Sequence, residues 1–162
     1  APDHTFLGFP QSLERTARRD VIRYALDTSI MLRWFSQEND ADTEQALHLR
    51  QEQLAETIDL VVLDQSVYEL LHVLKENARF SQELLSSALA SLDFMHLTIV
   101  PYSPELMRKA AQIACEYEVS IYAACFIALG AHLRCQAVTC DPELFRKVSA
   151  LPWTILLSNL NF

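Results

Sequence analysis

The chain has 162 residues, of which 51% are hydrophobic, and its formal net charge at pH 7 is -8. That length and apolar content suffice for one sizeable core, so we expect a single domain over residues 21–162 behind an N-terminal extension over residues 1–20. The acidity excludes nucleic-acid binding through the overall charge and would require a local basic patch. No run approaches the roughly 18 apolar residues of a membrane span, and the extension lacks the apolar segment of a signal peptide or anchor.

The cysteines and histidines do not follow the spacing of a metal site. Cys115, Cys125, Cys135 and Cys140 form no C-x-x-C pair, and the five histidines form no H-x-x-x-H motif. A chain of this size does not need disulfides for stability. We therefore expect free structural thiols, no zinc site and a cytoplasmic location.

Strands and helices are predicted to alternate along the chain. The apolar patterns and turn residues indicate strands over residues 21–26, 60–63, 96–100, 137–140 and 154–157. Helices are expected over residues 29–35, 42–58, 64–74, 81–94, 103–114 and 121–131, and from residue 141 onward. This order predicts an α/β fold whose mostly parallel, about five-stranded sheet is covered by helices on both faces.

Two of these helices differ in their expected burial. The helix over residues 42–58 is expected to be amphipathic, with its apolar side formed by Ala46, Leu47, Leu49, Leu54 and Ile58. Residues 121–131 contain no charged side chain, which predicts the central buried helix. Trp34 and Trp153 are expected in the core or in an interface.

Three acids follow or flank the predicted strand ends. Asp27 follows the first strand, Glu69 lies in the helix after the second, and Asp141 follows the fourth. The carboxyl ends of parallel strands meet at one edge of a sheet, where ligands bind. Each acid also has an ordinary explanation, as a helix N-cap for the two aspartates and as a boundary residue for Glu69. Together they suit Mg²⁺ or Mn²⁺, which take oxygen ligands and can activate a water for phosphodiester hydrolysis.

Four stretches resemble, in order, the acidic motifs of PIN-domain nucleases. They are RYALDTSI from Arg23, DQSVYELLHVL from Asp64, SIYAACFIALGAHL from Ser120 and AVTCDPELFRKV from Ala137. The resemblance, which extends from residue 21 to about residue 157, implies a three-layer α/β/α sandwich and usually a homodimer. For many bacterial and archaeal members it also implies a toxin ribonuclease of VapC type that is neutralised by a small antitoxin.

The resemblance also implies roles for individual residues. Asp27, Glu69 and Asp141 match the catalytic, metal-binding acids, and Ser29, Ser120 and Thr139 match supporting polar residues. The family usually has an aspartate after the stretch that corresponds to residues 120–122, where this chain has Ala123. With Ser120 as N-cap, position 123 is N3, where a carboxylate would be favoured. We therefore expect weak or absent nuclease activity. The sequence leaves open whether Ala123 is natural or engineered, and Glu116 and Glu118 are poor substitutes because they belong to the preceding helix and its exit.

A rim of basic residues is the candidate RNA-binding surface. It consists of Arg33, Lys75, Arg79, Arg146 and Lys147. Their alternative explanation is ordinary solvated charge, especially near helix C-termini where cations are favoured.

Three functions are consistent with these patterns. The leading hypothesis is a Mg²⁺- or Mn²⁺-dependent endoribonuclease of toxin-antitoxin type, with RNA as substrate and an antitoxin as partner. The alternative is a non-catalytic PIN-like module that binds RNA or protein. A signalling domain with Asp27 as phospho-acceptor is weaker, because the paired acids of such domains are absent and Glu69 and Asp141 would have no role.

Overall fold

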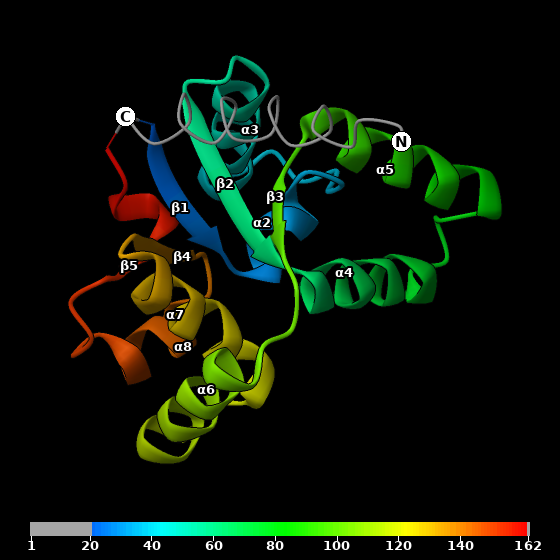
Figure 1. Ribbon diagram of the computed structural model, residues 1–162. Coiled ribbons are helices and arrows are strands. Elements are labelled where there is room, and N and C mark those ends of the chain that lie inside the picture. The colour runs from blue at the N-terminus through cyan, green and yellow to red at the C-terminus, as the bar shows by residue number, and fades with distance from the viewer. Residues whose placement is uncertain (1–20, 162) are drawn as a thin grey trace, which may run out of the picture.

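A five-stranded, wholly parallel sheet forms the centre of the protein (Figure 1). The computed structural model describes residues 21–161, so the predicted extension over residues 1–20 lies outside the described residues. The strand order is β3-β2-β1-β4-β5. The strand before Asp27, β1, therefore lies beside β2, the strand before the helix that contains Glu69. The strands are β1 Ile22–Leu26, β2 Ile58–Leu63, β3 Thr98–Val100, β4 Gln136–Thr139 and β5 Thr154–Leu156. The predicted parallel sheet is confirmed.

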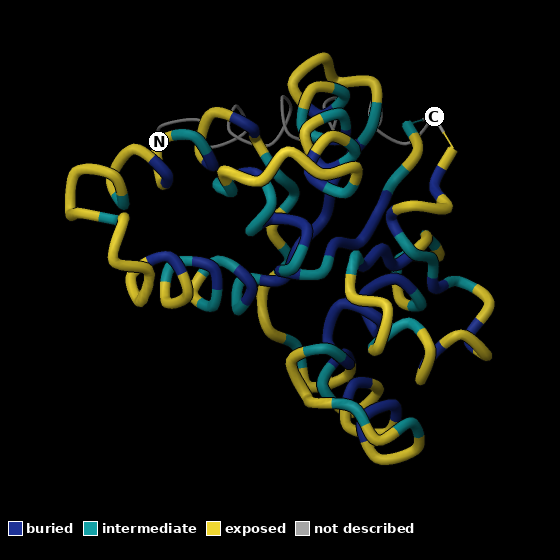
Figure 2. Tube along the Cα trace, turned by 180° about the vertical axis from the view of Figure 1, so that it is seen from behind, coloured by how far each residue is buried: buried dark blue, intermediate teal, exposed yellow. Residues whose placement is uncertain are grey.

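Helices cover both faces of the sheet, as the α/β/α prediction requires. One face is packed by α2 Thr28–Arg33, α3 Ala41–Leu54, α4 Asp64–Glu76 and α5 Gln82–Met95, together with the 3-10 turn Leu157–Asn159. The other face is packed by α6 Pro104–Tyr117, α7 Ile121–Leu133 and α8 Pro142–Val148. Figure 2 shows the result, with buried strands between helices whose outer surfaces are exposed.

The two cores are separated by the alternation of side chains along each strand. In β1, Tyr24 and Leu26 belong to the α2–α5 core, while Ala25 points into the α6–α8 core. In β2, Val62 belongs to the α2–α5 core and Val61 belongs to the α6–α8 core. Both faces of the strands are therefore apolar, which is typical of a parallel sheet with helices on each side.

Helix α7 is the central buried helix that its uncharged sequence predicts. Every residue from Ala124 to Gly130 is buried. Gly130 allows close approach to the sheet, because a Cβ there would lie 3.0 Å from the Cβ of Ala137. Trp153 closes the end of this core by donating its indole N–H to the carbonyl of Ile127 at 2.8 Å.

Trp34 has the corresponding role in the other core. It is buried and donates its indole N–H to the carbonyl of Ala46 at 2.8 Å. Both tryptophans thus pack within the protein, as expected. Within residues 21–161 no single helix has the length and apolarity needed to cross a membrane; α6 and α7 meet those criteria only as a pair bent by 119°.

The predicted helix over residues 42–58 was wrong at its C-terminal end and in part of its apolar side, of which Ala46 and Leu49 are buried as expected. Helix α3 ends at Leu54, and Ile58 is the first residue of β2. Glu56 has a positive φ of 59°, which turns the chain back toward the sheet. Leu47 and Leu54 are exposed, and the inward face instead carries Thr43, Ala46, Leu49 and Gln53.

Two strand starts also differ from the prediction. β1 begins at Ile22 instead of Val21, and Ile22, which was expected to be buried, is exposed. His96 ends α5 in the left-handed conformation, with φ 52°, so β3 begins only at Thr98. Apolar pattern alone does not register the turn at His96, because it depends on a single backbone dihedral.

Candidate active site

Asp27 lies at the carboxyl end of β1, the middle strand of the sheet. Its backbone N–H donates to the carbonyl of Val138 in β4 at 3.0 Å, which fixes its place between two strand ends. Although Asp27 occupies the N-cap position of α2, its side chain does not cap that helix. Its Oδ2 atom instead accepts hydrogen bonds from the hydroxyls of Ser29 at 2.8 Å and Thr139 at 2.7 Å. The explanation of Asp27 as a mere cap therefore does not hold.

The environment of this carboxylate disfavours its charge. Burial raises the pKa of Asp27, and the nearby charge of Glu69 adds to the rise, while the hydroxyls of Thr139 and Ser29 lower the pKa. Among residues 21–161, Asp27 forms no ion pair with a basic side chain. A partly buried carboxylate beside a second carboxylate is stabilised when a cation is present.

Glu69 extends from α4 toward the same edge of the sheet. Its Oε2 atom accepts from the hydroxyl of Thr28 at 3.3 Å and from the side-chain amide of Gln65 at 2.8 Å. Neither Thr28 nor Gln65 was predicted from the sequence as a site residue. The spacing of Gln65 and Glu69 by four residues on one helix was a usable signal, since such pairs face each other.

Asp141 is connected to Asp27 through Thr139, but its carboxylate points elsewhere. The backbone N–H of Asp141 donates to the hydroxyl of Thr139 at 3.1 Å, and that hydroxyl donates in turn to Asp27. The Oδ1 atom of Asp141 accepts from the backbone N–H groups of Glu143 at 3.0 Å and Leu144 at 3.2 Å, which caps α8. The capping alternative for Asp141 is therefore realised in this structure.

Position 123 has the helical geometry that the sequence predicts. Ser120 is the N-cap of α7, and its hydroxyl oxygen accepts from the backbone N–H of Ala123 at 3.1 Å. Two residues further along, burial raises the pKa of Cys125, with a smaller contribution from the charge of Glu69. The first turns of α7 thus lie within electrostatic reach of Glu69.

The donor set at this edge suits a hard divalent cation only in part. All the polar groups are oxygen donors, which is the chemistry that Mg²⁺ and Mn²⁺ prefer. Among the described residues, however, no three His, Cys, Asp or Glu side chains come close enough to hold a metal ion together. Asp27 and Glu69 lie close enough for their charges to interact, whereas the Asp141 carboxylate caps α8. The three-acid metal site stays a prediction.

The predicted RNA-contact residues all have partners within the protein. Arg33 pairs with Asp40 at 2.6 Å and Glu38 at 3.0 Å. Arg79 donates to the carbonyl of Phe35 and stacks 4.6 Å from the ring centroid of Phe80. The remaining partners are Glu76 for Lys75, Glu143 for Arg146, and the carbonyl of Glu118 for Lys147. This last contact involves the Glu118 backbone.

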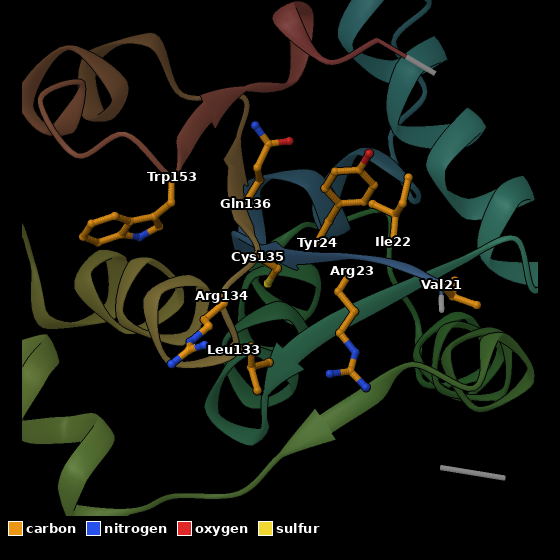
Figure 3. A pocket seen from close by; sticks show the side chains of 9 residues that line it. All are labelled: Val21, Ile22, Arg23, Tyr24, Leu133, Arg134, Cys135, Gln136 and Trp153. Carbon is orange, nitrogen blue, oxygen red and sulfur yellow. The ribbon is translucent and has the colours of Figure 1, made fainter. Parts of the chain in front are cut away.

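A hollow of about 660 Å³ lies at the opposite edge of the sheet. It is lined by the amino ends of β1 and β4 and by the end of α7, with the side chains of Arg23, Arg134 and Trp153 around it (Figure 3). Arg23 is paired with Asp59 at 3.1 Å. The acids from the sequence motifs, which lie at the carboxyl edge, do not line this hollow.

Fold and site together define a parallel α/β domain with carboxylates gathered at the carboxyl edge of its sheet. Residues 24–151 match the PIN domain family, and the chain therefore belongs to that family. Its members are generally nucleases and generally use divalent metals. No curated protein matches the chain in sequence.

Solved structures support the same fold. A toxin-antitoxin complex from Klebsiella pneumoniae superposes with a TM-score of 0.62 at 14% identity, covering 84% of this chain and 97% of that chain. VapBC2 from Rickettsia felis, bound to a DNA fragment from its promoter, gives 0.61 at 16% identity, with 83% and 97% covered. FitAcB from Neisseria gonorrhoeae gives 0.61 at 14% identity, with 86% and 100% covered. At these identities the likeness concerns the fold alone.

Proposed function

We propose that the chain is a metal-dependent endoribonuclease of PIN type and the toxin of a toxin-antitoxin pair, with activity weakened or lost because Ala123 replaces an acid. The observation that carries this proposal is the environment of Asp27. Its partly buried carboxylate is held by two hydroxyls beside Glu69, does not cap α2 and has no basic partner among residues 21–161. A purely structural aspartate would be expected to cap its helix or pair with a cation.

Asp27 and Glu69 are the residues that would hold Mg²⁺ or Mn²⁺, with Asp141 as a third ligand if its side chain leaves the α8 cap. When bound, such an ion activates water and stabilises the charge that develops on the phosphate. Ser29 and Thr139 orient Asp27 by donating to Oδ2. Thr28 and Gln65 orient Glu69 in the same way. The hydroxyl of Thr139 also ties the Asp141 backbone to Asp27.

Position 123 accounts for the proposed loss of activity. Its backbone N–H is fixed by Ser120 at the start of α7, and Ala123 packs against the hydrophobic cluster that includes Leu63, the last residue of β2. An aspartate there would add a carboxylate to the edge that holds Asp27 and Glu69, and it would lie at the positive end of the helix dipole. Alanine supplies no ligand, so the ion would be held by fewer carboxylates.

The proposed partners are RNA, a small antitoxin and a second copy of the chain. The antitoxin is supported by the solved structures of the same fold, among them a toxin-antitoxin complex from Klebsiella pneumoniae. We propose the cytoplasm as the compartment, where RNA substrates are present and the four free thiols would stay reduced.

Cleavage of single-stranded RNA in the presence of Mn²⁺ tests the proposal. Ala123→Asp is expected to cleave, and the unchanged chain is expected to be slower by about 10- to 100-fold or more, the usual effect of losing a group that positions a metal. Adding Asp27→Asn to Ala123→Asp should abolish the gain. Ala111→Asp, which adds the same charge on the exposed surface of α6, is the matched control and should have no effect.

One observation favours a second function, a non-catalytic PIN-like module that binds RNA or protein. Among the described residues, the acids do not form a set of three around one point. Calorimetric titration with Mn²⁺ separates the two functions. The nuclease predicts binding that weakens in Asp27→Asn. If Ala123→Asp does not cleave RNA and Mn²⁺ does not bind through Asp27, the non-catalytic module is the correct function.

A further inference from the structure

The charge distribution poses a problem for an RNA-binding surface. The net charge is -8, and all five basic residues predicted to contact RNA have acidic or carbonyl partners within the protein. Arg33 is held by two acids and Arg79 by a carbonyl and an aromatic ring, so releasing either one reduces what it gains from a phosphate. A strand of RNA at the carboxyl edge therefore needs a means of attachment that does not depend mainly on positive charge.

Three exposed tyrosines provide such a means. Tyr68 is 74% exposed, Tyr102 is 66% exposed and Tyr122 is 63% exposed. Within residues 21–161, none of their hydroxyls takes part in a hydrogen bond and none of their rings lies against a cation. These are large aromatic groups that the fold leaves open to solvent.

Two of the tyrosines are attached to the elements that follow β2 and β3. Tyr68 precedes Glu69 in α4, the helix that begins where β2 ends. Tyr102 lies in the connection from β3 to α6, and its backbone N–H donates to Oδ2 of Asp64, the first residue of α4, at 3.3 Å. In Figure 1 this connection passes the start of α4 on its way to α6. Tyr68 and Tyr102 therefore belong to the same part of the carboxyl edge.

Tyr122 borders the edge from the other core. It is the second residue of α7, directly before Ala123 and one turn before Cys125. The start of α7 packs in the same hydrophobic cluster as Leu63 and Val100, the last residues of β2 and β3, which places this end of α7 at the carboxyl edge of the sheet. The three tyrosines thus come from three separate segments at the carboxyl edge of the sheet, where Asp27 and Glu69 also lie.

We propose that Tyr68, Tyr102 and Tyr122 form a stacking platform that holds unpaired bases of single-stranded RNA beside the carboxylates. The inference rests on the proposed function, in which RNA is the substrate. Stacking on an aromatic ring requires no positive charge and tolerates any base, because every base has a π-face. It also requires that the bases be unpaired, so the platform selects single strands over duplexes.

Binding measured without cleavage tests the platform. Fluorescence anisotropy with a labelled single-stranded RNA of mixed sequence, in EDTA, gives a Kd for the unchanged chain and for each variant. Tyr68→Ala, Tyr102→Ala and Tyr122→Ala are each expected to weaken binding by roughly 5- to 100-fold, the range measured when a stacking aromatic is removed. The corresponding Tyr→Phe variants keep the ring and should bind like the unchanged chain.

Matched controls separate stacking from general effects. Phe94 is equally exposed, at 70%, but lies at the end of α5 that leads to the amino end of β3, so Phe94→Ala should leave the Kd unchanged. A duplex of the same sequence should bind more weakly than the single strand. The Kd for the single strand should also depend only shallowly on salt concentration, because few phosphates are neutralised.

Several results would overturn the platform, each independently of the nuclease. If Ala123→Asp cleaves RNA while the three Tyr→Ala variants bind as tightly as the unchanged chain, the nuclease stands and the platform is wrong. Absence of RNA binding by the unchanged chain also refutes it. If light scattering shows that the Tyr→Ala variants convert a dimer into a monomer, the tyrosines form an interface between copies instead. Binding that depends on the tyrosines without any cleavage would support the platform alone.

Discussion

Asp59 lies at the amino edge of the sheet and Asp27 at its carboxyl edge, and their surroundings differ. Asp59 is 5% exposed and accepts from the Arg23 guanidinium at 3.1 Å and from the Thr98 hydroxyl at 2.6 Å. Asp27 accepts from the hydroxyls of Ser29 and Thr139, with Glu69 as its charged neighbour. One aspartate has its countercharge built into the fold, and the other has a second negative charge instead.

The amino edge of the sheet contributes to the stability of the fold, whereas the carboxyl edge keeps carboxylates without a countercharge. At the amino edge, Gln53 is also fully engaged. Its amide donates to the carbonyls of Met95 and His96, both at 3.1 Å, and its oxygen accepts from the N–H of Leu60 at 2.7 Å. Polar groups at that edge satisfy one another and join α3, α5 and β2. At the carboxyl edge, the carboxylates are oriented but not neutralised, as in many sites that bind cations.

The largest effect is expected from removing the Gln53 amide. Gln53→Leu leaves two carbonyls and one N–H of the buried region without their partner, and each such group costs about 1–3 kcal/mol. We expect the free energy of unfolding to fall by about 3 kcal/mol, measured by urea denaturation. Gln51→Leu, on the exposed side of the same helix, should change it by less than about 0.5 kcal/mol. Equal effects of the two variants would mean that the amino edge does not depend on this residue.

A smaller loss is expected from Asp59→Asn. Breaking a buried ion pair commonly costs about 3–5 kcal/mol, but the Arg23 side chain is 36% exposed and can regain water, so we expect about 2 kcal/mol. Urea denaturation of Asp59→Asn beside Asp93→Asn, an exposed aspartate of α5, measures the difference. If the two variants are equally stable, the ion pair between Asp59 and Arg23 adds no stability, and the contrast between the two edges of the sheet is wrong.

The sequence was sufficient for the arrangement of elements, because that depends on patterns spread over many residues. All five strands, the helices between them and the uncharged α7 were predicted in order. The end of α3 was not, because the turn depends on Glu56 with a φ of 59° and on Gln53 at a buried position where apolar residues were expected. A polar residue that is buried with all its hydrogen bonds made looks like a surface residue in the sequence.

The acids could be assigned to one edge, but their side-chain contacts could not be predicted. Strand ends place Asp27, Glu69 and Asp141 by topology alone. Which hydrogen bond each carboxylate prefers depends on rotamers: Asp27 turns to Ser29 and Thr139, whereas Asp141 turns to its own helix. Two aspartates with the same capping signature in sequence therefore have different roles in the structure.

A gain in stability is expected from Asp27→Asn in the presence of a chelator. Asparagine keeps the shape and can still accept from Ser29 and Thr139, and it removes a charge that burial and Glu69 disfavour. We expect the free energy of unfolding to rise by up to about 1 kcal/mol, as is common when a functional group is removed from a site. A loss comparable to that of Asp59→Asn would show that Asp27 is a structural aspartate like Asp59.

The smallest effect, and the most specific, is the pH dependence of that gain. Because the pKa of Asp27 is raised in the folded protein, the folded state binds this proton more tightly than the unfolded state does. The resulting stability is fully present below the unfolded value of 3.8 and is lost as the pH rises through the raised folded pKa.

The difference in unfolding free energy between Asp27→Asn and the unchanged chain should therefore be near zero at low pH and grow toward neutral pH. Denaturation curves at several values between about pH 4 and pH 7, with chelator, measure it. Gln51→Leu alters no titrating group and should show a constant difference. A constant difference for Asp27→Asn as well would mean that the carboxylate charge is not disfavoured in the folded protein. The contrast between the two aspartates would then rest on hydrogen bonding alone.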